Sequence, residues 1–193
     1  MKTISIKQHK TITYLFRRDF LKLGFMVTGA VLNPFSTQAA FDSRPMKVKT
    51  LTFHNIQTDE RLHVGFFLDG KYDTGALTKI NYILRDHRNG EIIAIDVKLL
   101  DLLHAISNKT SRQVPLHVIS GYRSPATNKL LRKKSTGVAS KSLHMLGKAI
   151  DFRIPGFSTR QLRNVARKMK GGGVGYYPKS DFVHVDTGHV RYW

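Results

Sequence analysis

Short runs of β-forming residues, separated by segments with helical spacing, constrain the fold of this chain more than any other feature. Strand-like runs cover residues 47–54, 61–68, 116–120, 149–154, 173–176 and 182–187. The first two flank the polar segment 55–60, which predicts a β-hairpin with a longer loop. All of these runs are shorter than nine residues, so each must find its partners elsewhere in the chain to form a sheet.

Four segments between these runs have the pattern of helices. They cover residues 73–88, 96–109, 126–134 and 158–170. The first stops at Asn89 and Gly90, and the last begins after Ser158, a good N-cap, and stops at the glycines from Gly171. The order of these elements predicts an α+β domain in which helices pack on a small, mainly antiparallel sheet.

The first 39 residues have the layout of an export signal. A basic stretch precedes an apolar run over 20–32, and small or polar residues follow up to Ala39. Arg17 and Arg18, with the Phe-Leu-Lys that follows, resemble a twin-arginine signal, so we expect contact with the export machinery and delivery to the periplasm. The apolar run is shorter than the about 20 residues that span a bilayer, so we expect no stable membrane anchor. This divides the chain into a signal over 1–39 and one domain over 40–193.

The charge of the chain predicts an anionic partner. Lys and Arg number 32 against 13 Asp and Glu, a net charge of +19, of which +14 remains on residues 40–193. A basic helix with base-reading side chains, a zinc-finger spacing and an RNP-like aromatic pattern are all missing from the sequence, so we expect no nucleic-acid partner. A polyanionic wall polymer or a membrane surface explains the positive charge as well as nucleic acid does.

The absence of cysteine restricts the chemistry. Thiolate catalysis, disulfides and Cys-ligated zinc are excluded, so any metal must be held by histidines and carboxylates. His144 and Asp151 are seven residues apart, and a turn at Gly147 can aim both at one point. His184 lies on a later alternating strand, on the same face as Asp186. Two imidazoles and one carboxylate would leave a fourth tetrahedral position for water, as in catalytic zinc sites.

Three local sequences resemble the D-alanyl-D-alanine peptidases and related LAS-type zinc peptidases. Residues 142–151 (Ser-Leu-His-Met-Leu-Gly-Lys-Ala-Ile-Asp) are similar to the Ser-x-His and Gly-x-Ala-x-Asp signature of that group. Residues 120–124 (Ser-Gly-Tyr-Arg-Ser) are similar to its arginine loop, and residues 182–186 (Phe-Val-His-Val-Asp) to its last metal-ligand strand. The motifs follow the order of the family, and the likeness, strongest to its murein endopeptidases, covers nearly all of 40–193.

The resemblance implies roles for individual residues. His144, Asp151 and His184 would bind one Zn²⁺, and Arg123 and Ser142 would contact substrate, with Arg123 holding a carboxylate or steadying the oxyanion. The alternative for Arg123 is a structural salt bridge. For the general base, relatives place a carboxylate three residues before the last ligand, which is Asp181 here. Asp186 is the second candidate, either as the base or as a partner of His184.

The resemblance therefore implies a zinc-dependent endopeptidase that hydrolyses peptide cross-links of peptidoglycan. The bond could join D-alanine to diaminopimelate or two diaminopimelates, and the sequence does not choose between them. The alternative is a non-catalytic wall-binding protein with the same fold, although relatives that have lost activity usually lose metal ligands.

Overall fold

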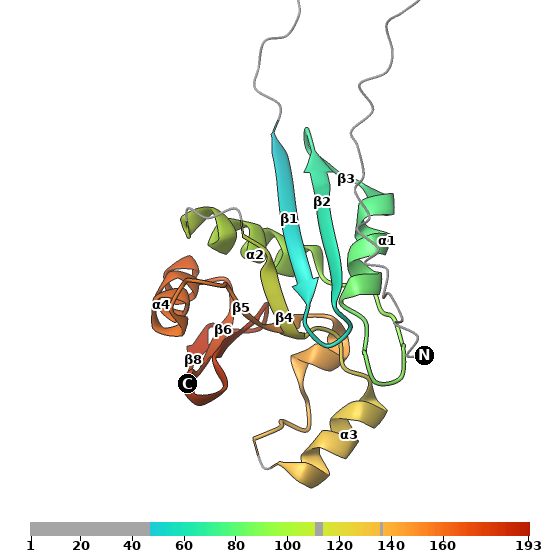
Figure 1. Ribbon diagram of the computed structural model, residues 1–193, viewed down its shortest axis with the longest axis vertical. Helices are drawn as coiled ribbons and strands as arrows, with labels where there is room; N and C mark the ends of the chain where they lie inside the picture. Colours follow the sequence, from blue (N-terminus) through green and yellow to red (C-terminus); the bar gives the residue numbers. More distant parts are fainter. Residues whose placement is uncertain (1–46, 111–113, 136) are drawn as a thin grey trace, which may run out of the picture.

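The computed structural model describes residues 47–110, 114–135 and 137–193 (Figure 1). The predicted export signal lies outside these residues and stays a prediction. Within them, every helix is too short or too polar to cross a membrane.

A β-hairpin opens the described chain, as the sequence predicts. Strand β1 (Val48–Asn55) pairs antiparallel with β2 (Glu60–Leu68). The short strand β3 (Lys71–Tyr72) pairs antiparallel with the other side of β2 and forms the edge of the sheet. The buried positions alternate along β1, where Leu51, Phe53 and Asn55 face inward.

The hairpin continues into one eight-stranded sheet with the order β3-β2-β1-β4-β5-β7-β6-β8. The remaining strands are β4 (Leu116–Ser120), β5 (Ala149–Arg153), β6 (Gly173–Tyr177), β7 (Phe182–Asp186) and β8 (Arg191–Tyr192). All neighbours are antiparallel except the pairs β1–β4 and β6–β8. With the helices below, this confirms the predicted α+β class; only β3 and β8, of two residues each, escaped the sequence pattern.

The four helices of the described residues each begin at a polar cap. They are α1 (Thr74–Ile83), α2 (Val97–Lys109), α3 (Pro125–Lys134) and α4 (Thr159–Met169), and two 3-10 turns, η1 (Leu143–Leu146) and η2 (Pro178–Ser180), complete the list. The cap side chains Asp73, Asp96, Ser124 and Ser158 each accept a backbone N–H of the first turn.

Helix α1 is shorter than the sequence predicts. It ends at Ile83, whereas the sequence predicts an end near Arg88. The cause is a tight turn around Asp86, a buried residue that is 1% exposed. The Asp86 backbone N–H donates to Glu91 O (3.0 Å), and its carbonyl accepts from Gly90 N (2.8 Å). These two bonds take the place of the hydrogen bonds that a longer helix would form. The helical spacing of Leu84 therefore reflects its burial in the core and not a further helical turn.

The core lies between one face of the sheet and helices α1, α2 and α4. Leu99, Leu100, Leu103 and Ile106 of α2 and Leu162 of α4 are buried against apolar residues of the strands. Residues of β5 and β7 that alternate with these core residues face the other side of the sheet. Helix α3 lies apart from the sheet (Figure 1), and the segment that follows it leads to η1.

Asp86 also ties the end of α1 to the loop before α3. Its carboxylate accepts from the backbone N–H groups of Ser124 (2.9 Å) and Arg88 (3.0 Å). Ser124 is fully buried and caps α3. The turn therefore fixes the loop that carries Arg123.

We predict that Asp86→Ala lowers the free energy of unfolding by about 2–3 kcal/mol, because the buried Ser124 N–H loses its acceptor. Urea denaturation measures the change. As a control, Asp73→Ala removes only the α1 cap bond to Ala76 N (2.8 Å) and should cost about 1 kcal/mol. A smaller loss in Asp86→Ala than in the control would contradict this role of the turn.

Candidate metal centre

Three elements bring His144, Asp151 and His184 together. Asp151 on β5 and His184 on β7 are direct neighbours in the antiparallel register, and His144 comes from η1 just before β5. Gly147 makes the turn between η1 and β5 with φ +64°, and a Cβ there would lie 2.5 Å from Ala94 O. Only glycine meets both requirements at this point.

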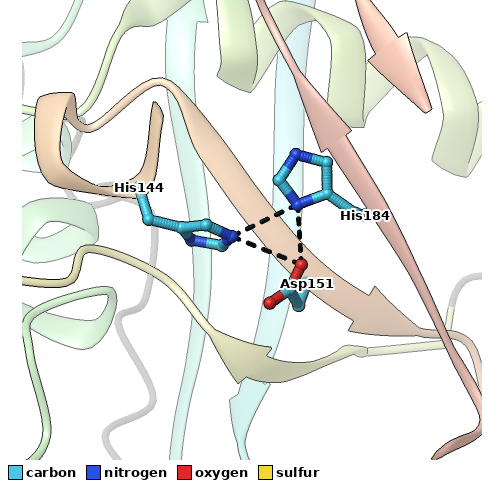
Figure 2. Close-up of side chains that lie close together, drawn as sticks. All are labelled: His144, Asp151 and His184. Carbon is cyan, nitrogen blue, oxygen red and sulfur yellow. Dashed lines mark hydrogen bonds and ion pairs between the residues drawn. The ribbon is translucent and has the colours of Figure 1, made fainter. Parts of the chain in front are cut away.

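The three side chains point at one position (Figure 2). His184 Nδ1 lies 2.8 Å from Asp151 Oδ1 and 3.2 Å from His144 Nε2, and His144 Nε2 lies 3.3 Å from Asp151 Oδ1. Donor atoms around a tetrahedral Zn²⁺ with bonds of about 2.0–2.1 Å are roughly 3.3 Å apart. The donor set and its spacing therefore fit a divalent metal ion.

The far side of each imidazole is hydrogen-bonded to a group that can only accept. His144 Nδ1 donates to the carbonyl of Gly121 (2.7 Å), and His184 Nε2 donates to Asp186 Oδ2 (3.1 Å). This directs His144 Nε2 and His184 Nδ1 toward the shared position and fixes the orientation of both rings. Such outer partners are typical of protein metal sites.

Burial and charge act in opposite directions on the ligands. Burial alone would raise the pKa of Asp151, but the two histidines outweigh it and hold this pKa well below its usual range. Burial alone would lower the pKa of His184, but hydrogen bonds to Asp151 and Asp186 raise it to about 9. In the metal-free protein the His184 ring is thus protonated on both nitrogens at neutral pH, and a metal ion must displace the proton on Nδ1.

Asp186 is a fully buried anchor for His184. Its carboxylate accepts from the backbone N–H groups of Gly173 (3.0 Å) and Gly188 (2.8 Å), from His184, and from Arg191 through two bonds of 2.8 and 3.1 Å. Burial opposes its ionisation, yet these donors hold the pKa of Asp186 well below its usual range. Of the two roles that the sequence left open for Asp186, these contacts favour that of a partner of His184.

Asp181 lies at the start of β7 with its side chain 60% exposed. It has φ +51°, forms an ion pair with Arg153 (3.2 Å) and accepts from the hydroxyl of Thr159. With Arg153 it borders a separate shallow hollow beside His117. The structure thus does not bring Asp181 together with the three candidate ligands.

Arg123 and Ser142 do line the cavity of about 460 Å³ that opens onto the three candidate ligands. The Arg123 guanidinium lies 3.6 Å from Asp151 Oδ2 and contacts Ser120 (3.3 Å) and Asn128 (3.4 Å). Burial lowers the pKa of Arg123, against the opposing effect of Asp151. Ser142 caps η1 without a side-chain bond to it, so its hydroxyl is not used there.

The sequence did not single out the aromatic residues that line the same cavity, namely Tyr177, Phe182 and Trp193. Trp193 lies with its ring centroid 5.4 Å from that of His184. Gly175, which pairs with His184 in the sheet, leaves room for this ring. A Cβ on Gly175 would come within 2.7 Å of the Trp193 indole, so glycine is required there by close approach.

Comparison with known proteins gives consistent matches. The Peptidase_M15_2 family model, described as peptidoglycan L,D-endopeptidase MepK, matches residues 43–193. Peptidoglycan L,D-endopeptidase MepK of Escherichia coli strain K12 is 42% identical over 178 residues, which are 92% of this chain and 96% of the relative. The probable peptidoglycan L,D-endopeptidase MepK of Haemophilus influenzae is also 42% identical over 178 residues, 92% of this chain and 95% of the relative.

We predict that metal affinity rises with pH up to about 9, because the raised pKa of His184 makes its proton compete with the metal. At lower pH the apparent affinity should fall by up to about tenfold for each pH unit. Competition with a metal-binding dye between pH 6 and 8 measures this, and calorimetry in two buffers counts the protons released. An affinity independent of pH, with no proton release, would contradict the prediction.

Proposed function

The chain belongs to the Peptidase_M15_2 family, and we propose on that premise that it is a zinc-dependent endopeptidase of peptidoglycan cross-links. The observation that carries the proposal is the convergence of His144, Asp151 and His184 at the floor of a cavity that Arg123 also lines. The relatives are named L,D-endopeptidases. Of the two bonds that the sequence left open, we therefore propose the link between two diaminopimelates, which joins an L centre to a D centre.

Zinc held by these three side chains would lower the pKa of a bound water toward about 7 and polarise the carbonyl of the bond to be cut. The surrounding residues fix the ligands: Gly121 and Asp186 orient the two imidazoles, and the carboxylate of Asp151 stays ionised. Arg123 is half-buried beside Asp151 and lines the cavity with a permanent charge. We assign to it the binding of a substrate carboxylate, with Ser142 as a neighbouring polar contact.

For the proton acceptor we propose Asp181 over Asp186. Every oxygen of Asp186 is occupied by donors, and its burial leaves no access for water. Asp181 is exposed and directly precedes the strand that carries His184. Its ion pair with Arg153 is at the surface, where such pairs contribute only about 0–1 kcal/mol, and its bond from the Thr159 hydroxyl is exposed too, so the carboxylate can leave both at little cost. In this role Asp181 takes a proton from the attacking water and returns it to the leaving amine.

The distribution of charge supports an anionic polymer as partner. Residues 40–101 contain nine basic and nine acidic residues, whereas residues 102–193 contain 17 Lys and Arg against three Asp. The whole excess of +14 therefore belongs to the half of the domain that builds the cavity. Such a field concentrates the protein on a surface that carries carboxylates. We also propose that the protein works in the periplasm after export through its twin-arginine signal.

We predict that His144→Ala abolishes hydrolysis of cross-linked muropeptide dimers, because it removes a metal ligand. His63→Ala is the matched control, since His63 lies on β2 outside both the cavity and the hollow beside Asp181, and it should keep near-normal activity. Product analysis by mass spectrometry follows the reaction and identifies the bond. Unchanged hydrolysis in His144→Ala would refute the proposed site, and wall binding without hydrolysis by the folded wild type would favour the non-catalytic alternative.

We predict different defects for substitutions of Asp181 and Asp186. Asp181→Asn should lower kcat by about 100-fold or more at unchanged metal affinity, because it removes the proton acceptor. Asp186→Asn should weaken metal binding by about 10–100-fold, because His184 loses the partner that orients it. Metal titration and kinetics at saturating zinc separate the two effects. Near-normal kcat in Asp181→Asn would exclude it as the base.

A further inference from the structure

One wall of the cavity is built from aromatic side chains whose positions are fixed by the surrounding structure. Tyr177 at the end of β6 pairs with Phe182 at the start of β7, and their rings stack with centroids 4.5 Å apart and planes 18° from parallel. Both rings line the cavity. The stack leaves the Tyr177 ring little freedom to turn.

Trp193 completes the wall and is held from several directions. Its backbone pairs with β6 through Tyr176 N to Trp193 O (2.9 Å) and Trp193 N to Val174 O (3.2 Å). The indole occupies the space that Gly175 leaves free, and the Arg191 guanidinium lies over it at 4.9 Å. Half of Trp193 stays exposed, and the residue lines the cavity.

The hydrogen bond between these residues has a defined direction. Trp193 Nε1 lies 2.9 Å from the Tyr177 hydroxyl, and an indole N–H can only donate. The Tyr177 oxygen is therefore the acceptor, and its own O–H must donate elsewhere. Among the residues that the structure describes, no acceptor lies within hydrogen-bond distance of this O–H. Because Tyr177 lines the cavity, this O–H can donate to a group bound there.

Tyr177 and Arg123 line the same cavity. The two donors suit different oxygens. The full charge and planar fork of Arg123 match a carboxylate, whereas a neutral, rigidly held O–H suits a carbonyl oxygen that gains charge only during the reaction.

We propose that the Tyr177 hydroxyl donates a hydrogen bond to the carbonyl oxygen of the bond being cleaved, and that Trp193 is the positioning residue that aims it. This inference rests on the proposed function. Because the donor is aligned before substrate arrives, its contribution is expected in the rate of the chemical step more than in binding.

The first test is Tyr177→Phe, which removes the hydroxyl and keeps the ring stacked on Phe182. We expect kcat for cross-linked muropeptide dimers to fall by roughly 10–100-fold, with KM changed by less than about twofold and metal affinity unchanged. The matched control is Tyr176→Phe, one residue earlier, whose ring lies beneath the Arg163 guanidinium (4.6 Å) and should be neutral. A Tyr177→Phe enzyme with normal kcat, or with a defect only in KM, would overturn the proposal.

The second test separates positioning from structure. Trp193→Phe removes the indole N–H. As a single substitution it should lower kcat by about 3–10-fold, and it should cause no further loss when added to Tyr177→Phe. Losses that multiply in the double variant would overturn the role of Trp193. Because Trp193 is the only tryptophan of the chain, its fluorescence reports whether Tyr177→Phe keeps the cavity wall intact. If folded, zinc-loaded wild type fails to cleave dimers, the proposed function fails with it; if the wild type cleaves and Tyr177→Phe equals it, only this inference fails.

Discussion

Two hydrogen bonds on the far sides of the histidine rings decide what this site can do. Gly121 O holds His144 and Asp186 holds His184, so the two free nitrogens and the Asp151 carboxylate meet at one point. Without these acceptors each imidazole could rotate or bind through its other nitrogen. The C-terminal part of the chain is organised around this need: Gly173, Gly188 and Arg191 all donate to Asp186, a buried charge that is stable only because it is fully paired.

The other acceptor depends on a distant part of the chain. Gly121 packs so closely against the end of α1 that a Cβ would lie 2.5 Å from Leu84 O, and Tyr122 N donates to the same carbonyl (2.7 Å). Asp86 then binds Ser124 on the other side of Arg123. The early end of α1 thus positions both the carbonyl that orients His144 and the arginine that faces the cavity, which explains why a polar turn interrupts a helical pattern there.

The sequence was sufficient for features that depend on local periodicity or on a spaced motif. Within the part of the chain that the structure describes, it predicted six of the eight strands, the four helices and the three residues that converge, because alternation and caps act within a few residues. It was not sufficient where distant partners compete. The end of α1 depends on Ser124, the role of Asp186 depends on Arg191 and on glycine backbone groups, and Asp181 turns toward Arg153 and Thr159. The aromatic wall was missed for the same reason, since Trp193 reaches Tyr177 only through the parallel pairing of β8 with β6.

We propose that a metal held by His144, Asp151 and His184 makes this protein a peptidoglycan endopeptidase. The most direct measurement is the fate of isolated cross-linked muropeptides incubated with the purified domain, first stripped by a chelator and then resupplied with zinc, with products identified by mass spectrometry. We predict no cleavage by the stripped protein and conversion of dimers to monomers after one equivalent of zinc. Cleavage that persists in the stripped protein, or none by the folded zinc-loaded protein, would contradict it.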